Sequence, residues 1–108
     1  MHEMKKKVYE YLLLIPKGKV VTYKQIALAL GNPKLARVVG NILHENPDEN
    51  KYPCYKVVNF QGKLAPNFVF GGLDKQKEKL NNEGIEVVDG KVDLKKYQWH
   101  ENENNKSS

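Results

Sequence analysis

Cysteine is almost absent from this chain, since Cys54 is the only one in 108 residues. A single cysteine excludes an internal disulfide and a zinc site built from several cysteines. No run of about 18 apolar residues occurs, so the sequence predicts no membrane-spanning helix. The opening stretch MHEMKKKVYEYLLLIP lacks the small-residue cleavage site of a signal peptide and is predicted to be helical. We therefore expect a cytoplasmic monomer with no structural metal, no cofactor and no membrane partner.

Acidic side chains are the minority among the charged residues. The chain has 18 Lys and Arg against 13 Asp and Glu, which gives a formal net charge of +5 at pH 7. A small basic domain favours a polyanionic partner, most simply nucleic acid. One domain is predicted over residues 1–100, followed by a disordered polar tail at 101–108. The positive excess therefore belongs to the folded part of the chain.

Three helices are predicted in the first half of the chain. Residues 4–15 place their apolar side chains on one helical stripe. Thr22 is predicted to cap the second helix, with Gln25 completing a capping box. Asn32 caps the third helix, which follows after a tight turn and runs to about residue 45. This pattern is typical of a helix-turn-helix, and a plain three-helix bundle fits it equally well.

The third predicted helix has two distinct faces at 100° per residue. Its apolar face is predicted to point inward and consists of Leu35, Val38, Val39, Ile42 and Leu43. Its outer face carries Pro33, Lys34, Arg37, Gly40, Asn41 and His44. A glycine on an exposed helix face is expected where another molecule approaches the backbone closely, as DNA does when a helix enters its groove. The alternative is that Arg37 is merely solvated and Gly40 merely tolerated.

The second half of the chain is predicted to be shorter and more mixed in structure. Residues 56–59 resemble a strand, and residues 73–82 a highly charged helix. The clearest hairpin is IEVVDGKVDL, whose two runs are joined by Asp89 and Gly90. The closing KKYQW segment is predicted to end the fold, with Trp99 packed on its edge. The expected fold is mainly α with a small β component, similar to a winged helix-turn-helix.

Five motifs together resemble those of one protein family. They are IPKGKVVTYKQIA, GNPKLARVVG, NP, PCYKVV and NEGIEVV, in that order and with fitting spacings. They resemble the DNA-binding domain of the O6-alkylguanine-DNA alkyltransferases, also called methylated-DNA–protein-cysteine methyltransferases, over about residues 4–99. One branch of that family transfers an alkyl group from guanine O6 to a cysteine. The other, the alkyltransferase-like proteins, binds the lesion without repairing it, and the C-terminal IEVVDGKVDLKKYQW is similar to that branch.

The resemblance implies which residues contact DNA. Tyr23 corresponds to a tyrosine that presses on the phosphate beside the lesion and helps to rotate the nucleotide. Arg37 corresponds to an arginine that fills the space left by the flipped base from the minor groove. The predicted DNA-contacting set is Thr22, Tyr23, Lys34, Arg37, Gly40, Asn41 and Lys56. Packing is the alternative role for Tyr23.

The resemblance also implies an alkyl-acceptor site. Cys54 corresponds to the acceptor, and Asn46 to an asparagine that orders the turn before it. Tyr55 stands where the enzymes have histidine, and Glu83 corresponds to the glutamate that orients that histidine. The lesion pocket is predicted to be lined by Pro53, Cys54, Val69, Phe70 and Gly71. Phe68 and Phe70 could form an apolar wall of this pocket or belong to the ordinary core, and the sequence fits both roles equally well.

The reactivity of Cys54 depends on the residue that follows it. The thiolate is the nucleophile, and a histidine acting through water normally removes the thiol proton in this family. Tyr55 has an unperturbed pKa of about 10 and is a donor rather than a base near neutral pH. Loss of a general base typically lowers a rate by about 10²–10⁴-fold. Without that base, Glu83 is expected to lack its usual partner.

Three functions remain open at this level. The first is a nucleoid-associated sensor that binds duplex DNA containing O6-alkylguanine, flips the base and flags it for nucleotide excision repair proteins. The second is a suicide methyltransferase that accepts the alkyl group on Cys54. The third is a generic basic winged-helix regulator, which would show no preference for damaged DNA. Both DNA-repair readings predict affinity that falls steeply with salt, because phosphate contacts release counterions.

Overall fold

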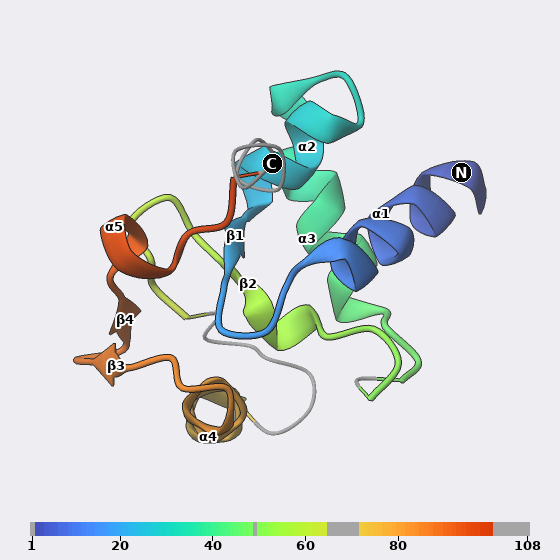
Figure 1. Cartoon of the computed structure of the whole chain (residues 1–108). Helices are drawn as coiled ribbons and strands as arrows, with labels where there is room; N and C mark the ends of the chain where they lie inside the picture. Colours follow the sequence, from blue (N-terminus) through green and yellow to red (C-terminus); the bar gives the residue numbers. More distant parts are fainter. Residues whose placement is uncertain (1, 49, 65–71, 101–108) are drawn as a thin grey trace, which may run out of the picture.

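The structure is a computed structural model that describes residues 2–48, 50–64 and 72–100 (Figure 1). The predicted tail at 101–108 lies outside the described residues. In chain order the elements are α1 (His2–Leu14), β1 (Val21–Thr22), α2 (Tyr23–Ala29), η1 (Pro33–Leu35), α3 (Ala36–His44), η2 (Cys54–Lys56), β2 (Val57–Val58), α4 (Gly72–Asn82), β3 (Val87–Val88), β4 (Lys91–Val92) and α5 (Leu94–Tyr97). The mainly helical fold with small sheets confirms the predicted class. No described helix is long and apolar enough to span a bilayer.

Helices α1, α2 and α3 enclose the first of two cores. The predicted inward face of α3 is confirmed, because Val39, Ile42 and Leu43 are buried while the opposite face is mostly exposed. Side chains from α1 and α2 complete this core, among them Leu12 and Ile26, which are fully buried. Packing of this apolar surface supplies most of the stability that such short helices lack on their own.

The starts of α2 and α3 follow the predicted capping chemistry. The Thr22 hydroxyl accepts a hydrogen bond from the Gln25 N–H (3.2 Å), and the Gln25 side chain accepts one from the Thr22 N–H (2.9 Å). This confirms the capping box. Asn32 also caps as predicted, but the turn that follows is the 3₁₀-helix η1 rather than α-helix. The left-handed backbone of Gly31 (φ 100°) reverses the chain between α2 and η1, so α2 and α3 form the predicted helix-turn-helix.

The strands are shorter than predicted. β1 pairs with β2 in parallel, with Val21 opposite Val57. Lys56, which was predicted to be in a strand, belongs instead to η2. The hairpin prediction is confirmed, because β3 and β4 are antiparallel and joined by Asp89 and Gly90, both with positive φ (54° and 74°). Two such residues are the requirement of a tight type I′ turn.

The C-terminal segment returns to the first core. The prediction that Trp99 packs at the edge of the fold is wrong, because the residue is only 2% exposed. Its ring packs in a T-shaped arrangement with the Tyr11 ring, with the two ring centroids 5.9 Å apart. Backbone hydrogen bonds hold it there, from the Val20 N–H to the Tyr97 carbonyl and from the Trp99 N–H to the Val20 carbonyl, both 2.8 Å. The short helix α5 in this segment was not predicted. A second core lies below, built from Val20, Val58, Leu64, Leu80, Ile85, Val87 and Val92.

Gly62 ties the turn after β2 to the hairpin. Its φ is +84°, and a Cβ at this position would lie 2.2 Å from the Val92 carbonyl oxygen. Gly90 also has a positive φ (+74°), but a Cβ there would meet nothing within 4 Å. An alanine at Gly90 would therefore cause backbone strain alone, whereas an alanine at Gly62 would cause backbone strain and a steric clash.

We predict that Gly62→Ala destabilises the fold much more than Gly90→Ala. The Gly90 variant should lose only the cost of a left-handed alanine, about 1–2 kcal/mol. The Gly62 variant adds a clash with backbone and should lose at least about 2 kcal/mol more. Urea unfolding of both variants and the wild type measures the difference. Equal losses would contradict the close approach at Gly62.

Candidate functional site

Tyr23 stands at the first position of α2, directly after its cap. Its ring is partly buried against the first core, and a Cβ added at Gly40 would lie 3.9 Å from Tyr23 Cε1. Burial raises the pKa of Tyr23, and the electrostatic interaction with nearby Cys54 raises it further. Tyr23 is therefore a neutral hydrogen-bond donor at neutral pH. It lies between the third helix and the cysteine.

The outward face of α3 and η1 is exposed and free of ion pairs within the described residues. Lys34, Arg37 and Asn41 all project from it into solvent. Arg37 is the only arginine in the chain. A guanidinium is planar and always charged, so it can stack on or replace a base in a way that lysine cannot. Gly40 lies on the same helix, half-buried beside Tyr23.

Cys54 begins η2 and faces the first core rather than solvent. It is 6% exposed and packs in the same cluster as Tyr23. The turn before it is fixed by the buried Asn46, whose side chain donates to the Tyr52 carbonyl (2.7 Å) and accepts from the Asp48 N–H (2.9 Å). Pro53 is half-buried at the start of η2. The backbone around the thiol is thus held from both sides.

Three donors converge on the carboxylate of Glu83. The Tyr55 hydroxyl donates to Oε2, the Gly18 N–H donates to Oε1 (3.0 Å), and the Lys56 ammonium lies 2.9 Å from Oε1. Burial alone raises the pKa of Glu83, but these hydrogen bonds and the Lys56 charge outweigh burial and lower it. Lys56 is itself 3% exposed and also donates to the Pro16 carbonyl at 2.8 Å. We call Tyr55, Lys56 and Glu83 the Glu83 cluster.

Two predictions are corrected by this geometry. Lys56 cannot contact DNA as predicted, because its ammonium is buried and bound to Glu83 and to backbone carbonyls. Thr22 is 6% exposed and its hydroxyl caps α2, so it positions Tyr23 instead of contacting a phosphate. Glu83 has no histidine partner, as expected, and the Tyr55 hydroxyl, which stands in the place of that histidine, donates to it instead.

The sequence reading missed Gln76, which holds the back of η2. Its side chain is fully buried in α4 and donates to the carbonyls of Tyr55 (3.0 Å) and Val57 (3.4 Å). The signal was its spacing four residues before the buried Leu80, which places a polar residue on the inward stripe of a charged helix. Gly18 was also missed, since only the fold brings its N–H to Glu83.

Part of the predicted pocket cannot be placed. Phe68, Val69, Phe70 and Gly71 lie outside the described residues, so the pocket is described only on the side of Pro53 and Cys54. Within residues 2–48, 50–64 and 72–100, no group of three or more His, Cys, Asp or Glu could hold a metal ion.

We predict that Glu83→Gln is strongly destabilising while the double variant Lys56→Met/Glu83→Gln is much less so. The single change leaves the buried Lys56 ammonium without a counter-charge, which typically costs about 3–5 kcal/mol. The double change removes both charges. Urea unfolding at pH 7 gives the two free energies. If the double variant is as unstable as the single one, the ion pair is not what holds Glu83.

The same comparison has a defined pH dependence. Because the pKa of folded Glu83 is lowered, its contribution to stability is present above its unfolded pKa and is lost as the pH falls through the folded pKa. The stability gap between wild type and Glu83→Gln should therefore be constant near neutral pH and shrink below about pH 4.3. A gap that is unchanged in acid would contradict the assignment.

The chain is similar in sequence to proteins of one known family. The family described as 6-O-methylguanine DNA methyltransferase, DNA binding domain, matches residues 3–85. A DNA base-flipping protein of Vibrio parahaemolyticus is 45% identical over 93 residues, which cover 85% of this chain and 91% of that protein. The alkyltransferase-like protein 1 of Schizosaccharomyces pombe is 35% identical over 104 residues, 92% of this chain and 96% of its own.

A solved structure and a longer relative complete the comparison. The crystal structure of S. pombe Atl1 in complex with damaged DNA containing O6-carboxymethylguanine matches with a TM-score of 0.84 and 34% identity, covering 93% of this chain and 97% of that one. A bifunctional methyltransferase/endonuclease of Picrophilus torridus is 41% identical, but the match spans only 30% of its length. The resemblance drawn from the sequence motifs is therefore confirmed, and the chain belongs to the family of the 6-O-methylguanine DNA methyltransferase DNA-binding domain.

Proposed function

We propose that this protein binds duplex DNA containing O6-alkylguanine, rotates the damaged base out of the helix and holds it without transferring the alkyl group. The observation that carries the proposal is the Glu83 cluster beside Cys54. The chain keeps the fold and the acceptor position of an alkyltransferase. The cluster, however, has Tyr55 in place of the histidine that would act as the general base. The S. pombe relative, solved with O6-carboxymethylguanine DNA, supports the same class of ligand.

Binding is assigned to the face formed by α2, η1 and α3. Tyr23 supplies a neutral phenol at the start of α2, next to Gly40 of α3. Arg37 is positioned to replace the extruded base, because a planar cation recovers part of the lost stacking and pairing. Lys34 and Asn41, exposed on the same face, are assigned to the DNA backbone and groove. Extruding a base costs a few kcal/mol, and least for a base that already pairs badly.

The absence of transfer is assigned to Tyr55. In a transfer reaction the S–H proton must leave as the methyl–O6 bond breaks and the S–CH₃ bond forms. The Tyr55 phenol keeps its proton and donates a hydrogen bond to the Glu83 carboxylate. A neutral phenol of this kind is not a base that can accept the proton of a thiol. Lys56, two residues after the thiol in η2, is already paired with Glu83, so it does little to favour a thiolate. Methyl transfer to the buried Cys54 remains the second candidate, because the thiol itself is present.

The flipped base is expected to act as a flag for other proteins. A bound but unrepaired lesion needs a downstream repair activity, and nucleotide excision repair proteins are the partners that we propose. The protein is proposed to act as a cytoplasmic, nucleoid-associated monomer on the DNA. The exposed Arg37 face, the net charge of +5 and the relative solved with damaged DNA support a DNA partner.

Arg37→Ala should abolish the preference for damaged DNA. The variant loses the group that substitutes for the extruded base, so binding to duplexes with and without one O6-methylguanine should become equal. Fluorescence anisotropy at several salt concentrations measures both affinities. A variant that keeps the wild-type preference would sink the assignment of Arg37.

Lys34→Ala is the matched control for that experiment. It removes a cation from the same exposed face without removing the base substitute. We expect it to weaken binding to both duplexes equally and to reduce the slope of log affinity against log salt by about 1. Its preference for the lesion should remain that of the wild type.

Intact-protein mass spectrometry after incubation with O6-methylguanine duplex separates the two candidate functions. We expect the wild type to remain unmodified while still binding. Tyr55→His should gain the mass of one methylene in a measurable fraction of molecules, because an imidazole beside Glu83 can accept the thiol proton. Tyr55→His/Cys54→Ser should gain nothing. A stoichiometric adduct on the wild type would overturn binding without transfer.

A further inference from the structure

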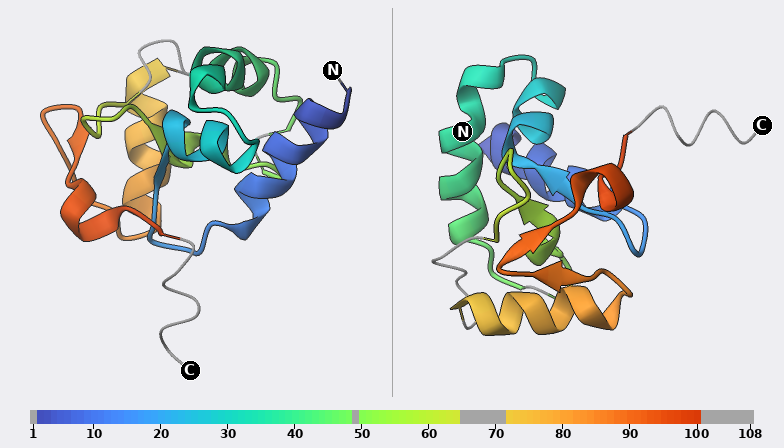
Figure 2. Two further views of the ribbon diagram at one scale, coloured as in Figure 1. Left: turned by 90° about the horizontal axis from the view of Figure 1, so that it is seen from above. Right: turned by 90° about the vertical axis from the view of Figure 1, so that its left-hand side faces the viewer.

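Four lysines belong to two segments, the turn after α1 and α5, that hydrogen bonds join. Lys17 and Lys19 belong to the turn after α1, and Lys95 and Lys96 belong to α5. The Lys19 ammonium donates to the Lys96 carbonyl (3.4 Å), and the adjacent Val20 N–H donates to the Tyr97 carbonyl (2.8 Å). We call these four lysines the α5 basic surface. Figure 2 shows α3 on one side of the molecule and α5 with this turn on the other.

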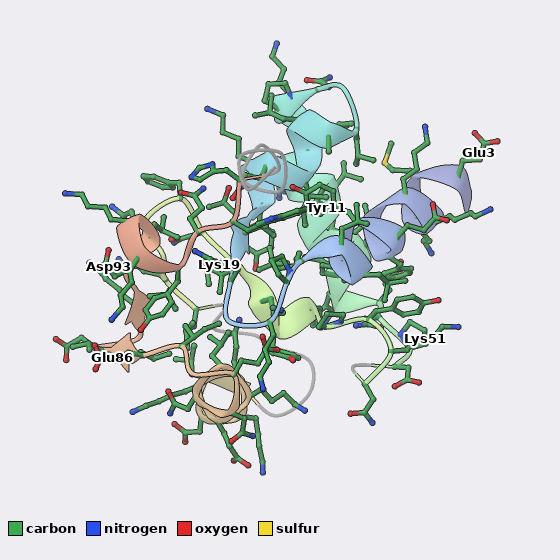
Figure 3. All side chains as sticks on the ribbon, viewed as in Figure 1. Glu3, Tyr11, Lys19, Lys51, Glu86 and Asp93 are labelled. Atoms are coloured by element: carbon green, nitrogen blue, oxygen red, sulfur yellow. The ribbon has the colours of Figure 1, made fainter. Side chains whose placement is uncertain are left out.

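The charge of the α5 basic surface is not balanced from within the described part of the chain. None of its four lysines forms an ion pair there, whereas Lys5, Lys56 and Lys75 do. Two carboxylates adjoin these segments and have other partners, because Asp93 caps α5 and Glu83 accepts from Gly18 and pairs with Lys56 (Figure 3 labels Lys19 and Asp93). Like charges held together repel one another in the free protein. An external anion would relieve that repulsion.

A groove adjoins this surface between α5 and the β3–β4 hairpin. Its volume is about 340 Å³, and Val92 and Tyr97 contribute apolar wall to it. Val88 also lines it, although its side chain is 58% exposed. Lys96 belongs to both the groove and the basic surface, and its ammonium lies 5.3 Å from the centre of the Tyr97 ring. Glu86 and Asp93 also line the groove, together with Lys91 and Lys96, so an acidic ligand would place its carboxylates on these two lysines.

We propose that the α5 basic surface and its groove dock an acidic segment of a partner protein, with one apolar side chain of that segment in the groove. A second DNA duplex would match the charge, but a sugar–phosphate backbone has no apolar side chain for Val88, Val92 and Tyr97 to bury. The proposal rests on the proposed function for its biological sense. DNA on the α3 face leaves this surface open, so a downstream repair protein could read the complex from behind.

The test uses the full chain and a defined probe. The probe is a fluorescein-labelled peptide of 12 residues, ten Asp and Glu around a central Leu-Leu pair, and a matched peptide carries Ser-Ser instead. Anisotropy is measured with the free protein and with the protein saturated by O6-methylguanine duplex. The patch variant is Lys17→Glu/Lys19→Glu/Lys95→Glu/Lys96→Glu. The control variant, Lys6→Glu/Lys7→Glu/Lys75→Glu/Lys77→Glu, changes four exposed lysines elsewhere and has the same net charge.

The expected result has three parts. The wild type binds the Leu-Leu peptide in both states, and the Ser-Ser peptide several-fold more weakly. The patch variant loses at least about ten-fold in peptide affinity, while its affinity for lesion DNA equals that of the control variant, which has the same net charge. The control variant keeps peptide affinity within about three-fold of the wild type. Shift mapping by NMR on the wild type should place the peptide at α5 and the hairpin, which needs no variant to fold.

Other outcomes overturn the proposal. These are no peptide binding by the wild type, equal losses in the patch and control variants, or NMR shifts on α3 alone. Displacement of the peptide by excess undamaged duplex from the DNA-saturated protein would assign the surface to a second DNA instead. Failure of the proposed function would be seen in a different measurement, in which the wild type would bind damaged and undamaged duplex with equal affinity. The peptide result with free protein does not depend on that preference.

Discussion

The carboxylate of Glu83 is where three separate segments of the chain meet. It accepts from the Gly18 N–H in the turn after α1, from the Tyr55 hydroxyl, and it pairs with Lys56 in η2. A buried charge is costly unless it is fully paired, so this arrangement is satisfied only when all three segments are in place. Glu83 therefore helps to position η2 and Cys54, together with Gln76 behind η2 and Asn46 in the turn before it.

The contacts of Lys56 tie the Glu83 cluster to a further segment of the chain. Lys56 also binds the carbonyls of Ile15 and Pro16, so the cation anchors the end of α1 as well as balancing Glu83. Tyr55 fills a position from which it can only donate toward that carboxylate. The cluster is thus saturated as a structural unit, and the thiol next to it has the setting of an acceptor without a base.

The two faces of the molecule are organised by different rules. On the α3 face the polar groups are spaced around a groove-reading helix and a lone arginine, and a neighbouring tyrosine stays neutral. On the opposite side of the molecule, backbone hydrogen bonds join two lysine-bearing segments that are far apart in the sequence (Figure 2). The first arrangement suits rotation and stabilisation of a nucleotide. The second suits attraction of a separate acidic molecule.

The sequence alone determined the local features, because their causes are local. Thr22 and Gln25 predict a capping box, and Asp89–Gly90 predicts a hairpin, since both depend on residues within four positions of one another. The inward and outward faces of α3 follow from its periodicity. Only the tertiary structure decided that Lys56 is buried, that Tyr55 binds Glu83, and that Lys19 donates to the Lys96 carbonyl of α5. Those contacts join residues 27 to 77 positions apart, and no local pattern records which distant partner a long polar side chain will find once the cores have packed.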